Sequence, residues 1–148
     1  MNGLKKISGR YMAFDYGSKR LGIAVTDPEH IIATALITIH PRTIISFLTE
    51  YLKTELVSAF IIGQPVQLNN EPSEITPQVE AFINLIKKNF SHIPILRIDE
   101  RFTSKMANQA VHQMGLRKKS RQNKSLIDKI SATLILQSYL EFESWNRN

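Results

Sequence analysis

The sequence predicts an α/β fold in which a mixed sheet of five strands is flanked by helices. Three short runs with strand character come first and are joined by short turns, which favours antiparallel pairing. After Pro41 the spacing of apolar residues changes to that of a helix, and helices then alternate with short apolar runs. An antiparallel meander followed by alternating helices and strands is typical of a mixed sheet with helices packed on it.

The first three predicted strands form two hairpins in series and cover residues 11–15, 21–26 and 34–39. Gly17 lies in the first turn, where we expect it to supply a positive φ. Asp27 and Pro28 mark the second turn, because proline fixes φ and does not fit a central position of a ladder.

Helices and strands alternate along the rest of the chain. The apolar spacing predicts a helix over residues 43–55. Thr76 and Pro77 suit the N-cap and first position of another helix, which we expect to end near Asn89. The remaining predicted elements are strands over residues 58–63 and 95–99 and helices over residues 103–114 and 125–143.

Length and composition indicate one folded domain spanning residues 1–148. Hydrophobic residues make up 43% of the 148 residues and charged residues 22%, which is ordinary globular usage. The absence of cysteine excludes disulfides, thiolate metal sites and a cysteine nucleophile. No stretch reaches the ~18 apolar residues of a membrane span, and the first ten residues have no apolar core of a signal peptide. We therefore expect a cytoplasmic protein with no membrane partner.

Nearly all of the net charge of +6 comes from one short basic tract. Eight consecutive residues contain no acidic side chain and five basic ones, Arg117, Lys118, Lys119, Arg121 and Lys124. Such a cluster is the electrostatic footprint of a polyanion such as nucleic acid. A solvated loop kept soluble by its charge explains the same residues, and composition does not separate the two interpretations.

Three acidic residues at the ends of predicted elements are candidates for catalysis. Asp15 closes the first strand, Glu100 follows the fifth, and Asp128 lies in the first turn of the last helix. If these ends converge, their carboxylates can hold one or two hard cations, magnesium or manganese, for phosphodiester hydrolysis. Ser131 and Ala132 are small, and we expect them to leave room for a ligand beside Asp128.

Each acid also has a structural interpretation. Asp15 can be a turn aspartate, Glu100 can pair with Arg101, and the segment from Ser125 to Asp128 reads as a variant capping box. Other chemistries have less support. The four histidines show no paired spacing for zinc or for a Ser-His-Asp triad, and neither of the common glycine-rich phosphate motifs is present.

Four ordered motifs extend over almost the whole chain. They read Phe14-Asp15-Tyr16-Gly17-Ser18-Lys19-Arg20-Leu21-Gly22-Ile23-Ala24, Ile62-Gly63-Gln64-Pro65, Asp99-Glu100-Arg101-Phe102-Thr103-Ser104, and Lys124-Ser125-Leu126-Ile127-Asp128-Lys129-Ile130-Ser131-Ala132. With these residues the chain resembles the YqgF (RuvX) family of Holliday-junction-resolvase-like proteins, which are also described as pre-ribosomal-RNA nucleases.

The resemblance implies a ribonuclease H-like fold and a nucleic-acid substrate. It assigns Asp15, Glu100 and Asp128 as the catalytic residues and as the ligands of Mg²⁺ or Mn²⁺, with Asp99 as the alternative to Glu100. The residues expected to contact nucleic acid are Lys19, Arg20, Arg101, Arg117, Lys118, Lys119, Arg121 and Lys124.

Two nuclease functions follow from the resemblance. The first is a metal-dependent endonuclease that processes the 5′ end of precursor small-subunit ribosomal RNA, as a monomer or homodimer. The second is a Holliday junction resolvase, which needs two active sites and hence a dimer. A noncatalytic RNA-binding module is a further alternative. So is an ATP-binding relative, because Asp15-x-Gly17-Ser18 also resembles the first phosphate loop of actin-like ATPases, although 148 residues supply only one of their two lobes.

Overall fold

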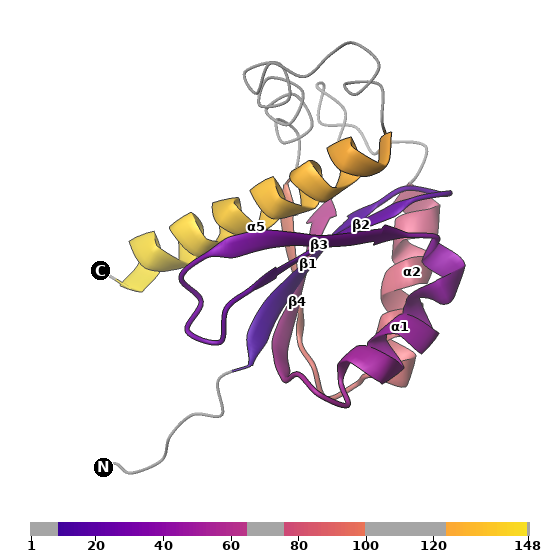
Figure 1. The fold of residues 1–148 in the computed structure, drawn as a ribbon, viewed down its shortest axis with the longest axis horizontal. Coiled ribbons are helices and arrows are strands. Elements are labelled where there is room, and N and C mark those ends of the chain that lie inside the picture. Colours follow the sequence, from indigo (N-terminus) through magenta and orange to yellow (C-terminus); the bar gives the residue numbers. More distant parts are fainter. Residues whose placement is uncertain (1–8, 65–75, 100–123, 148) are drawn as a thin grey trace.

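A computed structural model describes residues 9–64, 76–99 and 124–147 of the chain (Figure 1). Within these residues the strands are β1 (Arg10–Tyr16), β2 (Leu21–Thr26), β3 (Ala33–Ile39), β4 (Val57–Gln64) and β5 (Ile95–Asp99). The helices are the short 3₁₀ helix η1 (Pro41–Thr43), α1 (Ile44–Tyr51), α2 (Thr76–Asn89) and α5 (Lys124–Arg147). The predicted helix over residues 103–114 lies outside the described residues.

The five strands form one mixed sheet in the order β3-β2-β1-β4-β5, which confirms the predicted α/β class. The strands joined by short turns pair antiparallel, β1 with β2 and β2 with β3. β4 pairs parallel with β1, and β5 pairs parallel with β4. Parallel pairing needs a crossover, which η1 and α1 supply before β4 and α2 supplies before β5. The carboxyl ends of β1, β4 and β5 therefore lie at one edge of the sheet.

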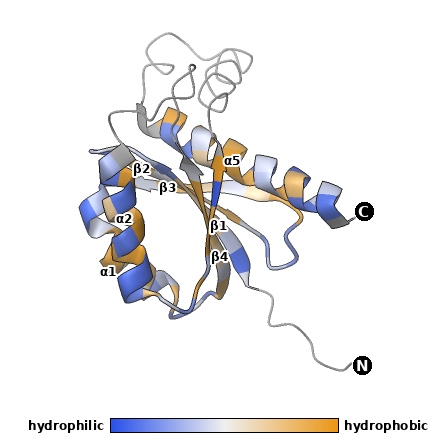
Figure 2. Cartoon of the chain, turned by 180° about the vertical axis from the view of Figure 1, so that it is seen from behind, coloured by the Kyte–Doolittle hydropathy of each residue, from blue (hydrophilic) through white to orange (hydrophobic). Residues whose placement is uncertain are grey.

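The two faces of the sheet are covered by different helices (Figures 1 and 2). On one face, Met12 and Phe14 of β1 pack with Leu48 of α1 and Ile83 of α2 in the larger core cluster. Figure 2 shows the hydrophobic sides of α1 and α2 turned toward this face. Because side chains alternate along a strand, the residues between these positions of β1 point to the other face.

The other face of the sheet is rich in alanine and is covered by α5. Ala13, Ala24 and Ala59, one from each of three neighbouring strands, pack with Ala132 and Leu136 of α5. Small side chains on both surfaces allow the helix backbone to approach the strands closely. The first half of α5 is thereby fixed against the centre of the sheet.

The predicted boundaries differ from the observed ones at three helices. The helix predicted over residues 43–55 is α1, which ends at Tyr51 because the chain tightens into a turn, with Lys53 and Thr54 donating to carbonyls three residues back. α2 and α5 each begin one residue earlier than predicted, and α5 continues to Arg147 instead of ending at Glu143. No helix among the described residues is long and apolar enough to cross a membrane.

The predicted reason for Gly17 is wrong, although its turn is present. Gly17 does not adopt a φ in the left-handed region. Instead, its N–H donates to the carbonyl of Arg20 at 2.9 Å, and an added Cβ would lie 2.8 Å from that same oxygen. The turn therefore requires glycine because of a close backbone approach.

The turn between β2 and β3 is organised by Asp27. Its Oδ1 accepts the N–H groups of Ile31 and Ile32, each at 2.7 Å, and its Oδ2 accepts that of Glu29 at 3.1 Å. His30, at the tip, has a φ of 61°. Three donors converging on one carboxylate stabilise its charged form.

Replacing Asp27 with asparagine is expected to destabilise the fold more at pH 7 than at pH 3. The hydrogen bond from Ile32 lowers the pKa of Asp27 most. Desolvation opposes it, and the hydrogen bonds from Ile31 and Glu29 lower the pKa further. Because the pKa is lowered on folding, the stabilisation is complete above the ordinary value of 3.8 and is lost as the pH falls through the folded value. Urea unfolding of wild type and Asp27→Asn at both pH values measures this. A difference in stability that stays the same at pH 3 would contradict the prediction.

Candidate functional site

Two of the acids considered above, Asp15 and Asp99, lie at the edge of the sheet where the parallel strands end. Asp15 is the last residue but one of β1, and Asp99 is the last residue of β5. Phe14 is in register with Ile62 of β4, and Ile62 with Arg97 of β5, so the two strand ends lie level with β4 between them. Ligand sites of open α/β sheets lie at this edge.

Gly22 shows how closely α5 approaches this edge. A Cβ added to Gly22 would lie 2.1 Å from the carbonyl oxygen of Asp128 and 3.1 Å from its Cβ. Gly22 is also the residue paired with Asp15 across the antiparallel β1–β2 ladder. Directly opposed residues in such a ladder have Cα atoms ~4.5–5.5 Å apart. Asp128 is thereby held against the strand pair that carries Asp15.

Asp15 lies on the same face of the sheet as α5. Tyr11 and Ala13 of β1 pack in the cluster that contains α5, whereas Phe14 and Tyr16 pack in the cluster that contains α1 and α2. Asp15 follows Ala13 by two residues and therefore shares its face. Since α5 covers this face, Asp15 and Asp128 lie on the same side of the sheet.

Arg20 belongs to the same cluster through an ion pair with Asp128. Its Nε donates to Oδ2 of Asp128 at 2.9 Å, and the side chains are 40% and 19% exposed, respectively. A pair this accessible to water contributes little to stability, at most ~1 kcal/mol. Its effect is to orient the carboxylate of Asp128 and to keep a guanidinium at the rim of the site. Sequence reasoning placed Arg20 on nucleic acid but missed this contact, because the two residues are 108 positions apart.

The structure corrects the interpretation of two small residues on α5. Ser131 and Ala132 were expected to leave room for a ligand beside Asp128, but their side chains are 2% and 0% exposed. Ala132 packs against Ala13 and Ala24 of the sheet. Their small size therefore serves the close approach of α5 to the strands, and neither lines an open site.

Several predicted site residues lie outside the described part of the chain. These are Glu100, Arg101, Arg117, Lys118, Lys119 and Arg121. Lys19 is described and exposed, in the turn that follows β1, and Lys124 is described as the first residue of α5. The described residues thus include two members of the predicted acidic triad, Asp15 and Asp128. Of the residues predicted to contact nucleic acid, the structure describes the side chains of Lys19 and Arg20.

The donor set at the edge fits a hard divalent cation. Asp15 and Asp128 provide carboxylate oxygens, the ligands that magnesium and manganese prefer. Within the described residues no group of three acidic or histidine side chains is gathered tightly enough to hold a metal. The third predicted ligand, Glu100, belongs to the segment after β5, so this observation does not include it.

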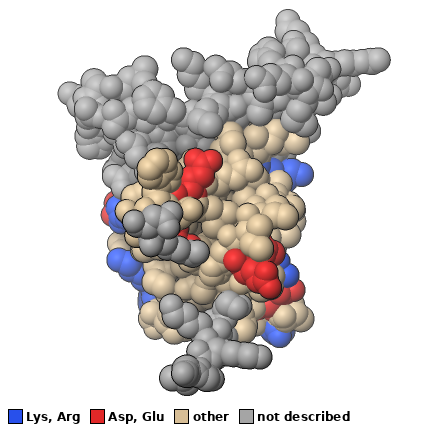
Figure 3. All heavy atoms as spheres, turned by 90° about the vertical axis from the view of Figure 1, so that its left-hand side faces the viewer, with Lys and Arg blue, Asp and Glu red and all other residues tan. Residues whose placement is uncertain are grey.

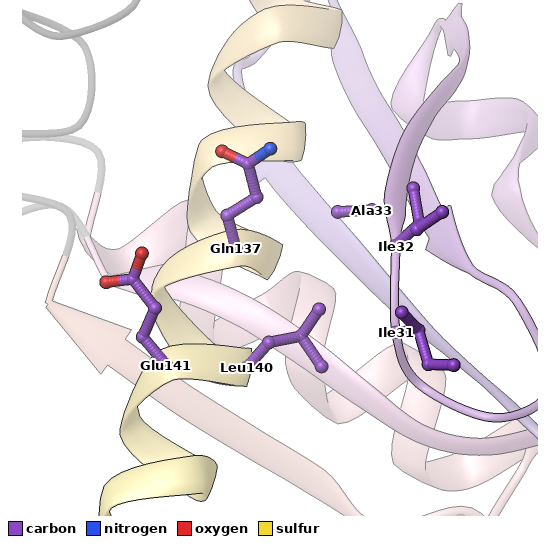
Figure 4. Close-up of a pocket in the computed structure, with 6 residues that line it drawn as sticks. All are labelled: Ile31, Ile32, Ala33, Gln137, Leu140 and Glu141. Carbon is purple, nitrogen blue, oxygen red and sulfur yellow. The ribbon is translucent and has the colours of Figure 1, made fainter.

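The opposite end of the molecule has a different character. Figure 3 shows the side where α5 ends, with acidic side chains among broad uncharged areas and lysine and arginine confined to the margins. The hollow drawn in Figure 4 also lies there, between Leu140 of α5 and Ile31 in the turn before β3. Phosphate binding requires concentrated positive charge, so the edge with Lys19 and Arg20 is the better candidate for a nucleic-acid interface.

The sheet order and the acids at its edge define a ribonuclease H-like protein. The chain matches the RuvX family, described as Holliday junction resolvase, over residues 9–142. The chain therefore belongs to the RuvX family.

Related proteins match most of the chain. The chain is 53% identical over 131 residues to a Flavobacterium psychrophilum protein named "Putative pre-16S rRNA nuclease", covering 88% of this chain and 96% of that protein. Proteins of the same name from Bacteroides fragilis and Phocaeicola vulgatus are 50% and 47% identical, covering 89% and 92% of this chain and 96% and 98% of their own lengths.

A crystal structure described as that of "a putative sugar kinase" from Cytophaga hutchinsonii resembles the chain at 16% identity and a TM-score of 0.39. It covers 68% of this chain and 39% of that one. This likeness is too low to bear on function.

Proposed function

We propose that the chain is a metal-dependent endonuclease that cuts the phosphodiester backbone of precursor small-subunit ribosomal RNA in the cytoplasm. The observation that carries the proposal is the contact of Gly22 with Asp128, which holds two carboxylates at the carboxyl edge of the sheet. The name of the relatives reported above, "Putative pre-16S rRNA nuclease", supports the substrate. The family match supports phosphodiester chemistry.

Each residue of the site has a role in this proposal. Asp15 and Asp128, together with Glu100, hold the metal, and Asp99 is the alternative to Glu100. A bound magnesium or manganese ion supplies Lewis-acid activation of water and of the phosphoryl oxygen. Arg20 orients the carboxylate of Asp128 through its ion pair and, with Lys19, presents positive charge to the phosphate backbone beside the cut.

The second candidate is a Holliday junction resolvase, which the description of the matching family favours. It uses the same acids on a different substrate. Because a junction is cut at two symmetric positions, this function needs two copies of the chain. Substrate preference and oligomeric state therefore separate the two candidates.

The test is cleavage of a precursor small-subunit RNA fragment and of a four-way DNA junction, side by side at one salt concentration. Each is incubated with magnesium, with manganese and with EDTA. Cleavage of the RNA only when metal is present supports the processing nuclease, and selective cutting of the junction by a dimer supports the resolvase. Tight binding with no cleavage of either substrate would overturn both candidates in favour of a binding module.

Substitution of Arg20 with alanine is expected to weaken nucleic-acid binding and to reduce its dependence on salt. Each phosphate contact contributes a slope of ~0.7–0.9 to the plot of log affinity against log salt concentration, and one contact should be lost. Binding titrations at several salt concentrations in EDTA measure the slope, with Lys19→Ala as the neighbouring comparison. If Arg20 serves only Asp128, its variant will keep the wild-type slope.

A further inference from the structure

An apolar hollow of about 300 Å³ lies beside the acid edge, on the face of the sheet that carries α2. Its lining includes Tyr16 at the end of β1 and Phe82 and Leu85 of α2. Phe82 is buried and its ring lies 5.1 Å from that of Tyr16, whereas Leu85 is 41% exposed. The hollow therefore has a fixed aromatic floor that is open to solvent.

Two exposed polar side chains also line this hollow, beside Pro41 and Ala81. Arg42 comes from η1 and Gln78 from the first turns of α2. Among the described residues, the guanidinium of Arg42 takes part in no ion pair, unlike those of Arg10, Arg20 and Arg97. The described lining contains no acidic side chain that would repel an anion.

The hollow lies close to the candidate catalytic site, because a residue that lines it is the next one along the chain from Asp15. Tyr16 follows Asp15 directly, so their Cα atoms are ~3.8 Å apart. Their side chains point to opposite faces of the sheet, Asp15 toward α5 and Tyr16 toward α2. A strand of nucleic acid that crosses this edge can present a phosphate to one face and a base to the other.

We propose that this hollow binds one unpaired nucleobase of the strand that is cut. Aromatic and apolar side chains bind a base by stacking, whatever its identity. The Arg42 guanidinium is placed for the adjoining phosphate, and the Gln78 amide can both donate to and accept from a base edge. A base in a fully paired duplex is not free to enter, so the site selects single-stranded or locally opened nucleic acid near the cut. This inference rests on the proposed nuclease function.

The size of the hollow agrees with this occupant. About 300 Å³ is at the lower end of the range for small-molecule sites. This volume suits one planar ring system and is too small for a strand or helix of a partner protein. The aromatic floor can stack on a base, the Gln78 amide can bind the base edge, and the Arg42 guanidinium, which has no ion pair among the described residues, can bind a phosphate. Together these groups are complementary to one nucleotide.

The test uses a short single strand that carries the fluorescent base 2-aminopurine at successive positions, made once as RNA and once as DNA. Binding is measured in EDTA, so the result does not depend on cleavage or on metal. Because stacking does not depend on the identity of the base, we expect the fluorescence of 2-aminopurine to change on binding at every position that the strand can place in the hollow. A fully paired duplex of the same sequence should show no such change.

Ala81→Phe fills the hollow from the exposed side of α2 without removing a core side chain. It is expected to abolish the fluorescence change and to weaken single-strand binding roughly tenfold. Asn84→Phe, which adds the same ring to an exposed position of α2 outside the lining, is the matched control and should behave as wild type. Arg42→Ala, which leaves the apolar lining intact, should weaken single-strand binding several-fold.

Two results would overturn the base site. One is wild-type affinity and fluorescence in Ala81→Phe, with thermal melting showing that it is folded. The other is equal weakening of single-strand and duplex binding in Arg42→Ala, which indicates a general phosphate contact.

The base site and the nuclease proposal can fail separately. If the fluorescence results are as expected while wild type cleaves nothing with metal, the nuclease proposal fails and the base site stands. Equal signals with RNA and DNA would show that the site does not distinguish ribose from deoxyribose. A signal with only one of them would identify the sugar that the site accepts.

Discussion

Replacement of Gly22 by alanine is expected to lower the free energy of unfolding by about 2–3 kcal/mol, the usual cost of overpacking a close contact. The added Cβ would lie 2.1 Å from the carbonyl oxygen of Asp128 and 2.5 Å from its carbonyl carbon. Both are backbone atoms of a helix and cannot rotate away, so α5 must shift or tilt. Alanine restricts the unfolded chain more than glycine does, which offsets only ~0.5–1 kcal/mol of the cost.

The same change should reduce cleavage more than the loss of stability explains. If α5 moves away from β2 to relieve the contact, Asp128 moves away from Asp15, and nuclease activity falls even at temperatures where the variant is folded. Urea unfolding and cleavage at low temperature measure the two effects. Ala35→Ser, which adds one heavy atom at an exposed position of β3, is the control and should stay within ~0.5 kcal/mol of wild type. A Gly22→Ala protein with wild-type stability and activity would show that α5 does not rest on β2 as described.

Replacement of Asp15 by asparagine is expected to reduce cleavage about a thousandfold, equivalent to ~4 kcal/mol of transition-state stabilisation. The amide has almost the same shape as the carboxylate but lacks its negative charge, so it holds a divalent cation poorly. Asp15 sits at the edge of the sheet and not in the core clusters, so the fold should persist. Binding of the substrate in EDTA should also persist, because it depends on the basic residues.

Asp27→Asn is the matched control for this variant. It makes the same chemical change in the turn between β2 and β3, at the end of the sheet opposite to the acid edge. It should lose stability but retain activity when assayed well below its melting temperature. If Asp15→Asn cleaves as well as Asp27→Asn does, Asp15 is a turn residue and the proposed catalytic assignment is wrong.

The sequence by itself determined the strands, their order along the chain and most helix positions. Strand β2, for example, occurs at the predicted residues because its apolar and β-branched residues end at a turn that contains Pro28. Helix α2 likewise occupies nearly the predicted range, since its apolar residues Val79, Phe82, Ile83 and Ile86 repeat at helical spacing. These are local properties, readable within a few residues of one another.

The end of α1 was harder to predict. Leu52 and Leu56 continue the apolar spacing past Tyr51, but the chain leaves the helix to reach the start of β4. The cause is the position of β4 in the sheet, which is not encoded in the helix itself. The pairing of β4 with β1, which is distant in the sequence, thus ends α1 although apolar residues continue at helical spacing.

Only the tertiary structure decided which residues form the site. In the sequence Gly22 is one residue of a motif. The structure shows that it leaves room for the backbone of α5 at Asp128, more than a hundred residues later. Ser131 and Ala132 looked like space for a ligand and are instead the surface that lets the helix approach the sheet. Arg20 pairs with Asp128, and Tyr16 and Arg42 line one hollow, because the sheet brings the end of β1 beside both η1 and α5. Contacts of this kind depend on how elements pack in space, and the spacing of residues along the chain carries no information about them.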